Sequence, residues 1–88
     1  MSDHVVVSLL LFAKARELVG SSKVSLTIPS SVSTYPQIVA FIKSEHPELK
    51  RLGDTFVLSH NENYVEQSAE IEFSPGDELA IIPPISGG

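Results

Sequence analysis

Apolar and polar positions follow three different patterns along the first third of the chain, and each predicts a different element. Residues 5–12 (VVVSLLLF) are apolar with little alternation, which predicts a strand that is covered on both faces. Residues 23–28 (KVSLTI) alternate strictly, which predicts a half-buried strand ending at Pro29. Between them, residues 13–19 are helix formers closed by Gly20, which suits the C-terminal cap of a short helix. Because this connection is short, we expect the two strands to pair as antiparallel neighbours.

A longer helix is predicted to begin after Thr34. Thr34 and Gln37 have the spacing of a capping box, and the proline between them is tolerated in a first helical turn. Pro47 should end the helix near His46. The apolar positions of this segment fall at i, i+3 and i+4, which predicts that one side of the helix is buried, and they are Ile38, Phe41 and Ile42.

The second half of the chain predicts several short strands joined by turns. Residues 55–59 form the first strand, and the turn formers at 60–63 should reverse it. Residues 68–73 (SAEIEF) alternate, which predicts a strand that buries Ile71 and Phe73. The sequence SPGD then suits a type II turn before a final strand, ELAII.

The order of these elements predicts an α+β fold in which one mixed sheet packs on one main helix, with a short first helix beside it. We expect a single domain over residues 1–84 and a flexible tail over residues 85–88. Because one helix covers only one face of the sheet, the apolar first and last strands should place hydrophobic groups on the open face. That face is either a docking surface or is covered by a loop or by the short first helix.

The composition excludes several kinds of chemistry. The chain has no cysteine, so it has no disulfide, no thiolate nucleophile and no cysteine-ligated metal site. The three histidines, His4, His46 and His60, have no carboxylate at a ligand-like spacing, so we expect no metal site. The isolated glycines exclude a phosphate-binding glycine-rich loop. The folded body therefore contains no recognisable active site.

Charge is distributed unevenly along the chain. All six lysines and arginines lie at or before Arg51, whereas the residues from Leu52 onward include seven acids and no base. This acidic half should repel nucleic acid and favours a basic protein surface as partner, or it serves only as a solvated face. No apolar stretch is long enough to span a membrane, so we expect a cytoplasmic protein without a membrane partner.

The two C-terminal glycines are the remaining chemical feature. Glycine has no Cβ, so Gly87 and Gly88 can pass through a channel too narrow for other residues and present the terminal carboxylate to a partner. Pro83 and Pro84 fix the backbone before this segment, which lowers the entropy lost when it enters a partner. A carboxylate needs activation before it can react, for instance as an acyl-adenylate.

These segments resemble the MoaD family, the small sulfur-carrier subunits of molybdopterin synthase. The resemblance covers essentially the whole chain and rests on FAKARELVG, HPEL, NENYV and, most specifically, PGDELAIIPPISGG. It implies a ubiquitin-like β-grasp fold. The sequence departs from the common pattern at Ser59 and His60, where small apolar residues usually stand.

The resemblance also implies partners and a chemical cycle. An E1-like adenylyltransferase of the MoeB type would use ATP to adenylate Gly88, and a sulfur donor would convert it to a thiocarboxylate. The tail residues Ile85, Ser86 and Gly87 would then enter the large subunit, of the MoaE type, in an expected heterotetramer. There sulfur would pass to cyclic pyranopterin monophosphate to form the dithiolene of molybdopterin. The chain itself would bind no cofactor, and the catalytic pocket would lie on the large subunit.

In that family an apolar patch on the open sheet contacts the partner, and the matching residues here are Phe12, Tyr64 and Ile82. Three alternatives remain open from the sequence. The chain could carry sulfur for thiamine synthesis or tRNA thiolation, it could be a ubiquitin-like protein modifier, or it could be a noncovalent interaction module with an inert Gly-Gly end.

Overall fold

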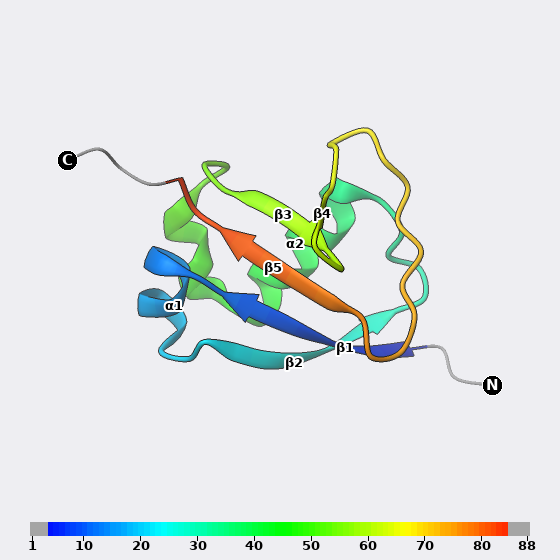
Figure 1. The fold of residues 1–88 in the computed structure, drawn as a ribbon, viewed down its shortest axis with the longest axis horizontal. Coiled ribbons are helices and arrows are strands. Elements are labelled where there is room, and N and C mark those ends of the chain that lie inside the picture. The colour runs from blue at the N-terminus through cyan, green and yellow to red at the C-terminus, as the bar shows by residue number, and fades with distance from the viewer. Residues whose placement is uncertain (1–3, 85–88) are drawn as a thin grey trace.

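The computed structural model describes residues 4–84 of the chain, which form a five-stranded sheet, two α-helices and one 3-10 helix (Figure 1). Along the chain the elements are β1 (His4–Leu11), α1 (Ala13–Val19), β2 (Lys23–Pro29), α2 (Tyr35–Glu45), η1 (Pro47–Leu52), β3 (Val57–His60), β4 (Asn63–Tyr64) and β5 (Glu78–Ile82).

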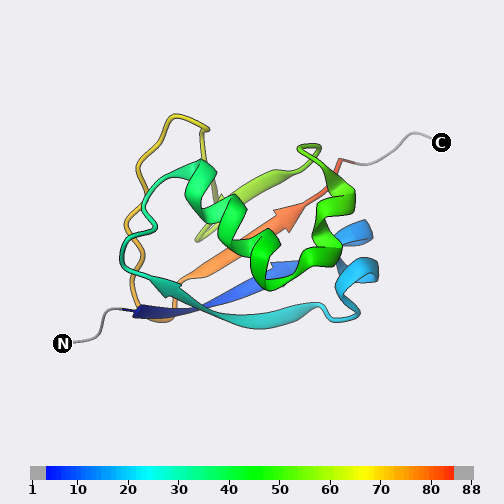
Figure 2. The same cartoon turned by 180° about the vertical axis from the view of Figure 1, so that it is seen from behind.

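The sheet is mixed, with the strand order β2-β1-β5-β3-β4. β1 pairs antiparallel with β2, as predicted, and parallel with β5, while β3 pairs antiparallel with both β5 and β4. The last strand is therefore the central one. Figures 1 and 2 show α2 and η1 on one face of the sheet and no helix across the middle of the other. This is the expected α+β arrangement, a β-grasp in which the sheet packs on one main helix.

The hydrophobic core lies between α2 and the sheet. Along β1, burial alternates, and every second side chain, Val7, Leu9 and Leu11, is buried. Ile38 and Ile42 are buried on one side of α2, as predicted, whereas Phe41, the third residue of the predicted stripe, is only half-buried against the core. Burying each of these large aliphatic side chains contributes about 1.5–3 kcal/mol to folding. The other large side chains that are fully buried are Leu26, Ile28, Leu49, Leu58, Leu79 and Ile81.

Both α-helices have the termini predicted from the sequence. The Thr34 hydroxyl accepts a hydrogen bond from the Gln37 amide, and the Gln37 side chain accepts one from the Thr34 amide, which completes the capping box. Gly20 ends α1 with a φ of 84°, in the left-handed region that glycine adopts without strain. Gly76 has a φ of 85° in the turn closed by the Asp77 amide and the Ser74 carbonyl, as a type II turn requires.

Three details differ from the sequence predictions. β1 is not covered on both faces, since Val6 is 55% exposed. Residues 68–73 form no strand; one isolated bridge joins Glu70 to Thr34, and the Ile71 amide donates to the Ser33 carbonyl. Ile71 is nevertheless buried and Phe73 is half-buried against the core. The 3-10 helix η1, which buries Leu49 and Leu52, was not predicted.

None of the helices formed by residues 4–84 combines the length and the apolar character that crossing a membrane requires.

Candidate partner-docking site

The strand register places a row of four side chains across the open face of the sheet. Leu10 of β1 pairs with Ala80 of β5, Ala80 pairs with Ser59 of β3, and Ser59 pairs with Tyr64 of β4. Directly opposed residues in a sheet project from the same face. Leu9, Leu58 and Leu79 precede Leu10, Ser59 and Ala80 along their strands and are buried in the core cluster, so the row of four side chains faces away from the core.

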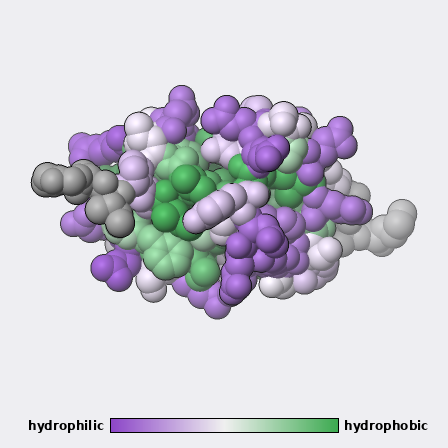
Figure 3. Space-filling model, turned by 45° about the horizontal axis from the view of Figure 1, so that its top comes forward, coloured by the Kyte–Doolittle hydropathy of each residue, from purple (hydrophilic) through white to green (hydrophobic). Residues whose placement is uncertain are grey.

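This row lines a hollow of about 300 Å³, here called the docking hollow. The three residues that the family resemblance identified, Phe12, Tyr64 and Ile82, all line it. Phe12 is 46% exposed and Tyr64 is 78% exposed, so the apolar surface is open. Figure 3 shows apolar side chains gathered in the middle of this side of the molecule and bordered by hydrophilic ones. The complete lining is Leu10, Phe12, Ser59, Glu62, Tyr64, Glu78, Leu79, Ala80 and Ile82.

The end of β1 positions Phe12 on the open face. Phe12 has an extended backbone (φ −117°, ψ 153°), and its amide donates to the Ile81 carbonyl at 3.3 Å. The strand alternation that buries Leu11 therefore continues through Phe12 and directs it to the side of Leu10. Its carbonyl then accepts from the Ala15 amide as α1 begins. The neighbouring helix thus fixes the residue without covering it.

The tight turn between β3 and β4 positions Tyr64. Asn61 and Glu62 have φ values of 50° and 71°, the left-handed pair that a two-residue hairpin requires. The turn is also held to the start of β5, since the Asn61 amide donates to the Glu78 carbonyl at 2.8 Å and the Glu78 amide donates to Asn61 Oδ1 at 2.9 Å. These bonds hold Tyr64 beside the central strand.

A carboxylate near this hairpin has a shifted pKa. Asp77 accepts a hydrogen bond from the Ser74 amide at 2.9 Å and another from the His60 ring, and these two contacts lower its pKa, the first more than the second. The sequence around His60 does not indicate this partner, because Asp77 is distant along the chain. No group of three potential metal ligands occurs within residues 4–84.

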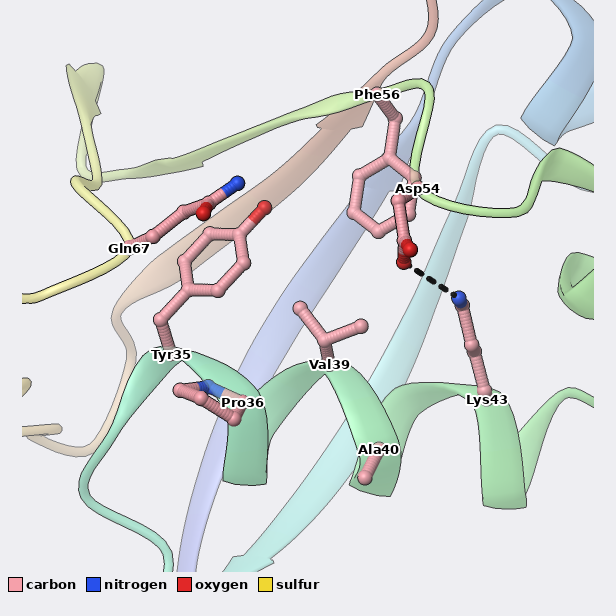
Figure 4. Close-up of a pocket in the computed structure, with 8 residues that line it drawn as sticks. All are labelled: Tyr35, Pro36, Val39, Ala40, Lys43, Asp54, Phe56 and Gln67. Atoms are coloured by element: carbon pink, nitrogen blue, oxygen red, sulfur yellow. Dashed lines mark ion pairs between the residues drawn. The ribbon is translucent and has the colours of Figure 1, made fainter.

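A second hollow, of about 510 Å³, lies on the helix side of the molecule (Figure 4). Tyr35 and Val39 point into it from α2, and Phe56 faces them from the segment before β3. Lys43 Nζ lies 3.5 Å from Asp54 Oδ1, 2.8 Å from the Gly53 carbonyl and 5.6 Å from the centre of the Phe56 ring. The amine is thus engaged by three neighbours, and Phe12, Tyr64 and Ile82, the predicted site residues that the structure describes, do not line this second hollow.

Burial raises the pKa of Tyr35 in this second hollow, and the negative charge of Asp54 raises it further. The phenol therefore stays protonated at neutral pH and is a weak nucleophile. This arrangement contains no nucleophile paired with a base, so the helix side offers no catalytic constellation among the described residues.

The predicted tail lies next to the docking hollow along the chain. Ile82, which lines the hollow, is the last residue of β5, and Pro83 and Pro84 follow it directly. The predicted tail residues Ile85, Ser86, Gly87 and Gly88 lie outside the described residues. A partner seated on the docking hollow would therefore lie beside the point where the chain leaves the sheet.

The sequence and fold match known proteins along nearly the whole chain. The model of the ThiS family matches residues 9–88. The molybdopterin synthase sulfur carrier subunit of Aedes aegypti is 42% identical, and the alignment covers 99% of this chain and 94% of that protein. The crystal structure of SAMP1 from Haloferax volcanii superposes with a TM-score of 0.75 at 26% identity, covering 94% of this chain and 99% of the other.

A complex of subunits 1 and 2 of molybdopterin-converting factor from Helicobacter pylori contains a chain with the same fold. The TM-score is 0.62 at 16% identity, over 96% of this chain and all of the other. Together with the ThiS match, the identity to sulfur carrier subunits confirms the resemblance seen in the sequence. The chain belongs to the ThiS family and, within it, to the relatives of the MoaD-type sulfur carrier subunits.

Proposed function

We propose that this chain is the sulfur carrier subunit of molybdopterin synthase and that it carries sulfur as a thiocarboxylate on Gly88. The observation that carries the proposal is the family match, which extends through the C-terminal glycines to residue 88. The absence of cysteine agrees with it, because the sulfur would be held by the main-chain terminus and needs no side chain. On its own the chain is a substrate-like donor and not an enzyme.

Loading sulfur onto the chain requires two steps at the Gly88 carboxylate. In the first, a Gly88 oxygen attacks the α-phosphorus of ATP on an E1-like partner, which releases pyrophosphate and forms the acyl-adenylate. In the second, a sulfur nucleophile attacks the acyl carbon and AMP leaves with the bonding electrons, so the phosphate becomes the leaving group that a free carboxylate lacks. The resulting thiocarboxylate sulfur would then attack a carbon of cyclic pyranopterin monophosphate on the large subunit, and water would cleave the acyl–sulfur bond, which leaves the sulfur on the pterin and returns the Gly88 carboxylate.

The geometry of the described residues supports a docking role for the folded body, with the chemistry left to the tail and its partners. An exposed hollow lined by Phe12, Tyr64 and Ile82 provides apolar area for a partner. Residues 85–88 can extend about 13 Å beyond Pro84, at roughly 3.3 Å per residue. The body would therefore dock on the large subunit and the tail would reach its pocket. The Helicobacter pylori complex, of a chain with this fold and a second subunit, supports such a partner.

Removal of Gly88 tests the proposal. We expect the shortened chain to bind the large subunit with unchanged affinity, because the docking hollow is intact, and to transfer no sulfur, because the reactive carboxylate is displaced by one residue. A shortened chain that still supports molybdopterin formation would show that the terminal glycine carries no sulfur.

The similarity to SAMP1, which is named a small archaeal modifier protein, favours one second candidate, a ubiquitin-like protein modifier that would use the same C-terminal carboxylate. The two functions differ in the acceptor of the acyl group. A modifier would form isopeptide bonds between Gly88 and lysine side chains of other proteins, whereas a sulfur carrier regenerates a free carboxylate. Mass spectrometry of high-mass adducts after incubation with an E1-like enzyme and ATP would therefore detect only the modifier.

A further inference from the structure

The docking hollow contains polar groups that an apolar contact alone does not explain. Two exposed glutamates, Glu62 in the β3–β4 turn and Glu78 at the start of β5, line it together with the aromatic residues. No lysine or arginine is among the lining residues. In the same cross-strand row the next base is Lys23, which pairs with Leu10 from β2 and so lies on the far side of that leucine. The hollow thus carries negative charge on an apolar surface.

Ser59 adds an unused hydrogen-bonding group to the lining of the docking hollow. It is only 6% exposed, and its hydroxyl forms no hydrogen bond with another described residue. Every fully enclosed side-chain nitrogen or oxygen within residues 4–84 does have a partner. The Ser59 hydroxyl must therefore remain open to the hollow that it lines, where a ligand atom can reach it.

Docking of an apolar partner would remove water from all three groups. A hydroxyl that loses water without gaining a hydrogen bond weakens binding, and an unpaired carboxylate weakens it more. A partner that binds here must consequently supply hydrogen-bond donors, and the two carboxylates require positive charge as well. The apolar walls require that this charge be carried at the end of an aliphatic stem.

We propose that the docking hollow binds the side chain of one basic residue, arginine or lysine, on the docking face of the large subunit. The inference rests on the proposed function, since it takes the large subunit as the partner. The aliphatic stem would pack on Phe12 and Ile82, and the cationic end would donate to Ser59 Oγ and to the carboxylates of Glu62 and Glu78. The exposed Tyr64 ring offers a further favourable contact to a cation. These polar groups make the hollow selective for a basic partner surface.

Two matched double variants test the inference against the large subunit of molybdopterin synthase. Glu62→Gln with Glu78→Gln removes both charges from the hollow. Glu66→Gln with Glu72→Gln removes two charges from exposed glutamates of the same acidic half that do not line it. Titration calorimetry at low and high salt compares the dissociation constants of both variants with that of the unmodified chain.

We expect the hollow variant to bind on the order of tenfold more weakly and to lose most of the salt dependence of binding, while the control changes by less than about threefold. Equal effects of the two variants would overturn the inference, because the charges would then act only through the net charge. Such a result leaves the proposed function standing, since binding and sulfur transfer would persist in the unmodified chain. Absence of binding by the unmodified chain would overturn both.

A third variant, Ser59→Ala, isolates the hydroxyl. It removes one acceptor for the partner's cation and leaves both charges in place, so we expect a loss of affinity of a few fold without a change in salt dependence. Unchanged affinity would remove Ser59 from the binding site.

Discussion

Nε2 of His60 lies 2.7 Å from Oδ2 of Asp77, although the two residues are far apart in the sequence. An ionised carboxylate can only accept a hydrogen bond, so Nε2 carries the proton and donates it. His60 is the last residue of β3 and Asp77 immediately precedes β5. The contact therefore ties the hairpin that carries Tyr64 to the start of the central strand.

The Asp77 carboxylate makes stability depend on pH in acid. The pKa of Asp77 is lowered from its usual 3.8, mainly by the Ser74 amide and then by His60, so the folded state binds the Asp77 proton less readily than the unfolded state. Its contribution is complete above the unfolded pKa and is lost as pH falls through the lower folded pKa. We expect Asp77→Asn to reduce the free energy of unfolding by about 1–3 kcal/mol at pH 7, and by less as pH falls below the unfolded value.

Urea unfolding of the Asp77→Asn variant and the unmodified chain between pH 7 and pH 3 measures this difference. Glu72→Gln, at an exposed position, is the matched control and should change stability by less than about 0.5 kcal/mol. A deficit of Asp77→Asn that stayed constant across this pH range would show that the negative charge contributes nothing.

The capping box of α2 predicts a second effect on stability. Thr34→Ala removes the hydroxyl that accepts from the Gln37 amide, and we expect the free energy of unfolding to fall by about 1 kcal/mol. Ser31→Ala, at an exposed position in the same loop, is the control and should cost less than about 0.5 kcal/mol. Equal losses in thermal or urea unfolding would contradict a capping role for Thr34.

Two substitutions on the open face separate docking from general surface effects. Phe12 and Val6 are both exposed and both belong to this face, but only Phe12 lines the docking hollow. We expect Phe12→Asp to weaken binding to the large subunit by at least about tenfold, since exposed aromatic anchors carry much of the binding energy at interfaces. Val6→Asp introduces the same charge and should have little effect. Similar affinities of the two variants would remove Phe12 from the interface.

A branched side chain in the tail should block transfer without affecting docking. Gly87→Val adds bulk where the resemblance implies a narrow channel, so we expect binding to the large subunit to persist and sulfur transfer to stop. Single-turnover formation of molybdopterin from a pre-charged carrier measures the second effect. Normal turnover by this variant would show that the tail does not pass through a channel.

Elements specified by neighbouring residues could be predicted from the sequence. The Thr34–Gln37 capping box, the glycine after α1 and the SPGD turn each depend on contacts within four residues, and all three are present. The alternation of apolar and polar residues in β2 correctly predicted the face that contains Leu26 and Ile28 as the buried one. Residues 68–73 also alternate, but within residues 4–84 their strand-like pairing is limited to one isolated bridge between Glu70 and Thr34, outside the sheet, so Ile71 is buried without forming a strand.

Features that depend on pairing between distant segments could not be predicted. The apolar run of β1 looks the same whether its second face is covered by the chain itself or by a partner, and the exposure of Val6 shows that this chain leaves it open. Ser59 lines the docking hollow because of the register of β3 against β5. The His60–Asp77 contact depends on the same pairing. No pattern in the neighbouring sequence indicates the position of Ser59 or the contact between His60 and Asp77. Tyr64 was identified only through the family resemblance.

The central claim is that the body serves to dock and that the Gly88 carboxylate carries the sulfur. The most direct test is the intact mass of the chain after incubation with a MoeB-type enzyme, ATP and a sulfide source. We predict a mass gain equal to the replacement of one oxygen by one sulfur, located at Gly88 by fragmentation and absent without ATP. An unchanged mass with an active enzyme, or sulfur located on any other residue, would contradict the account.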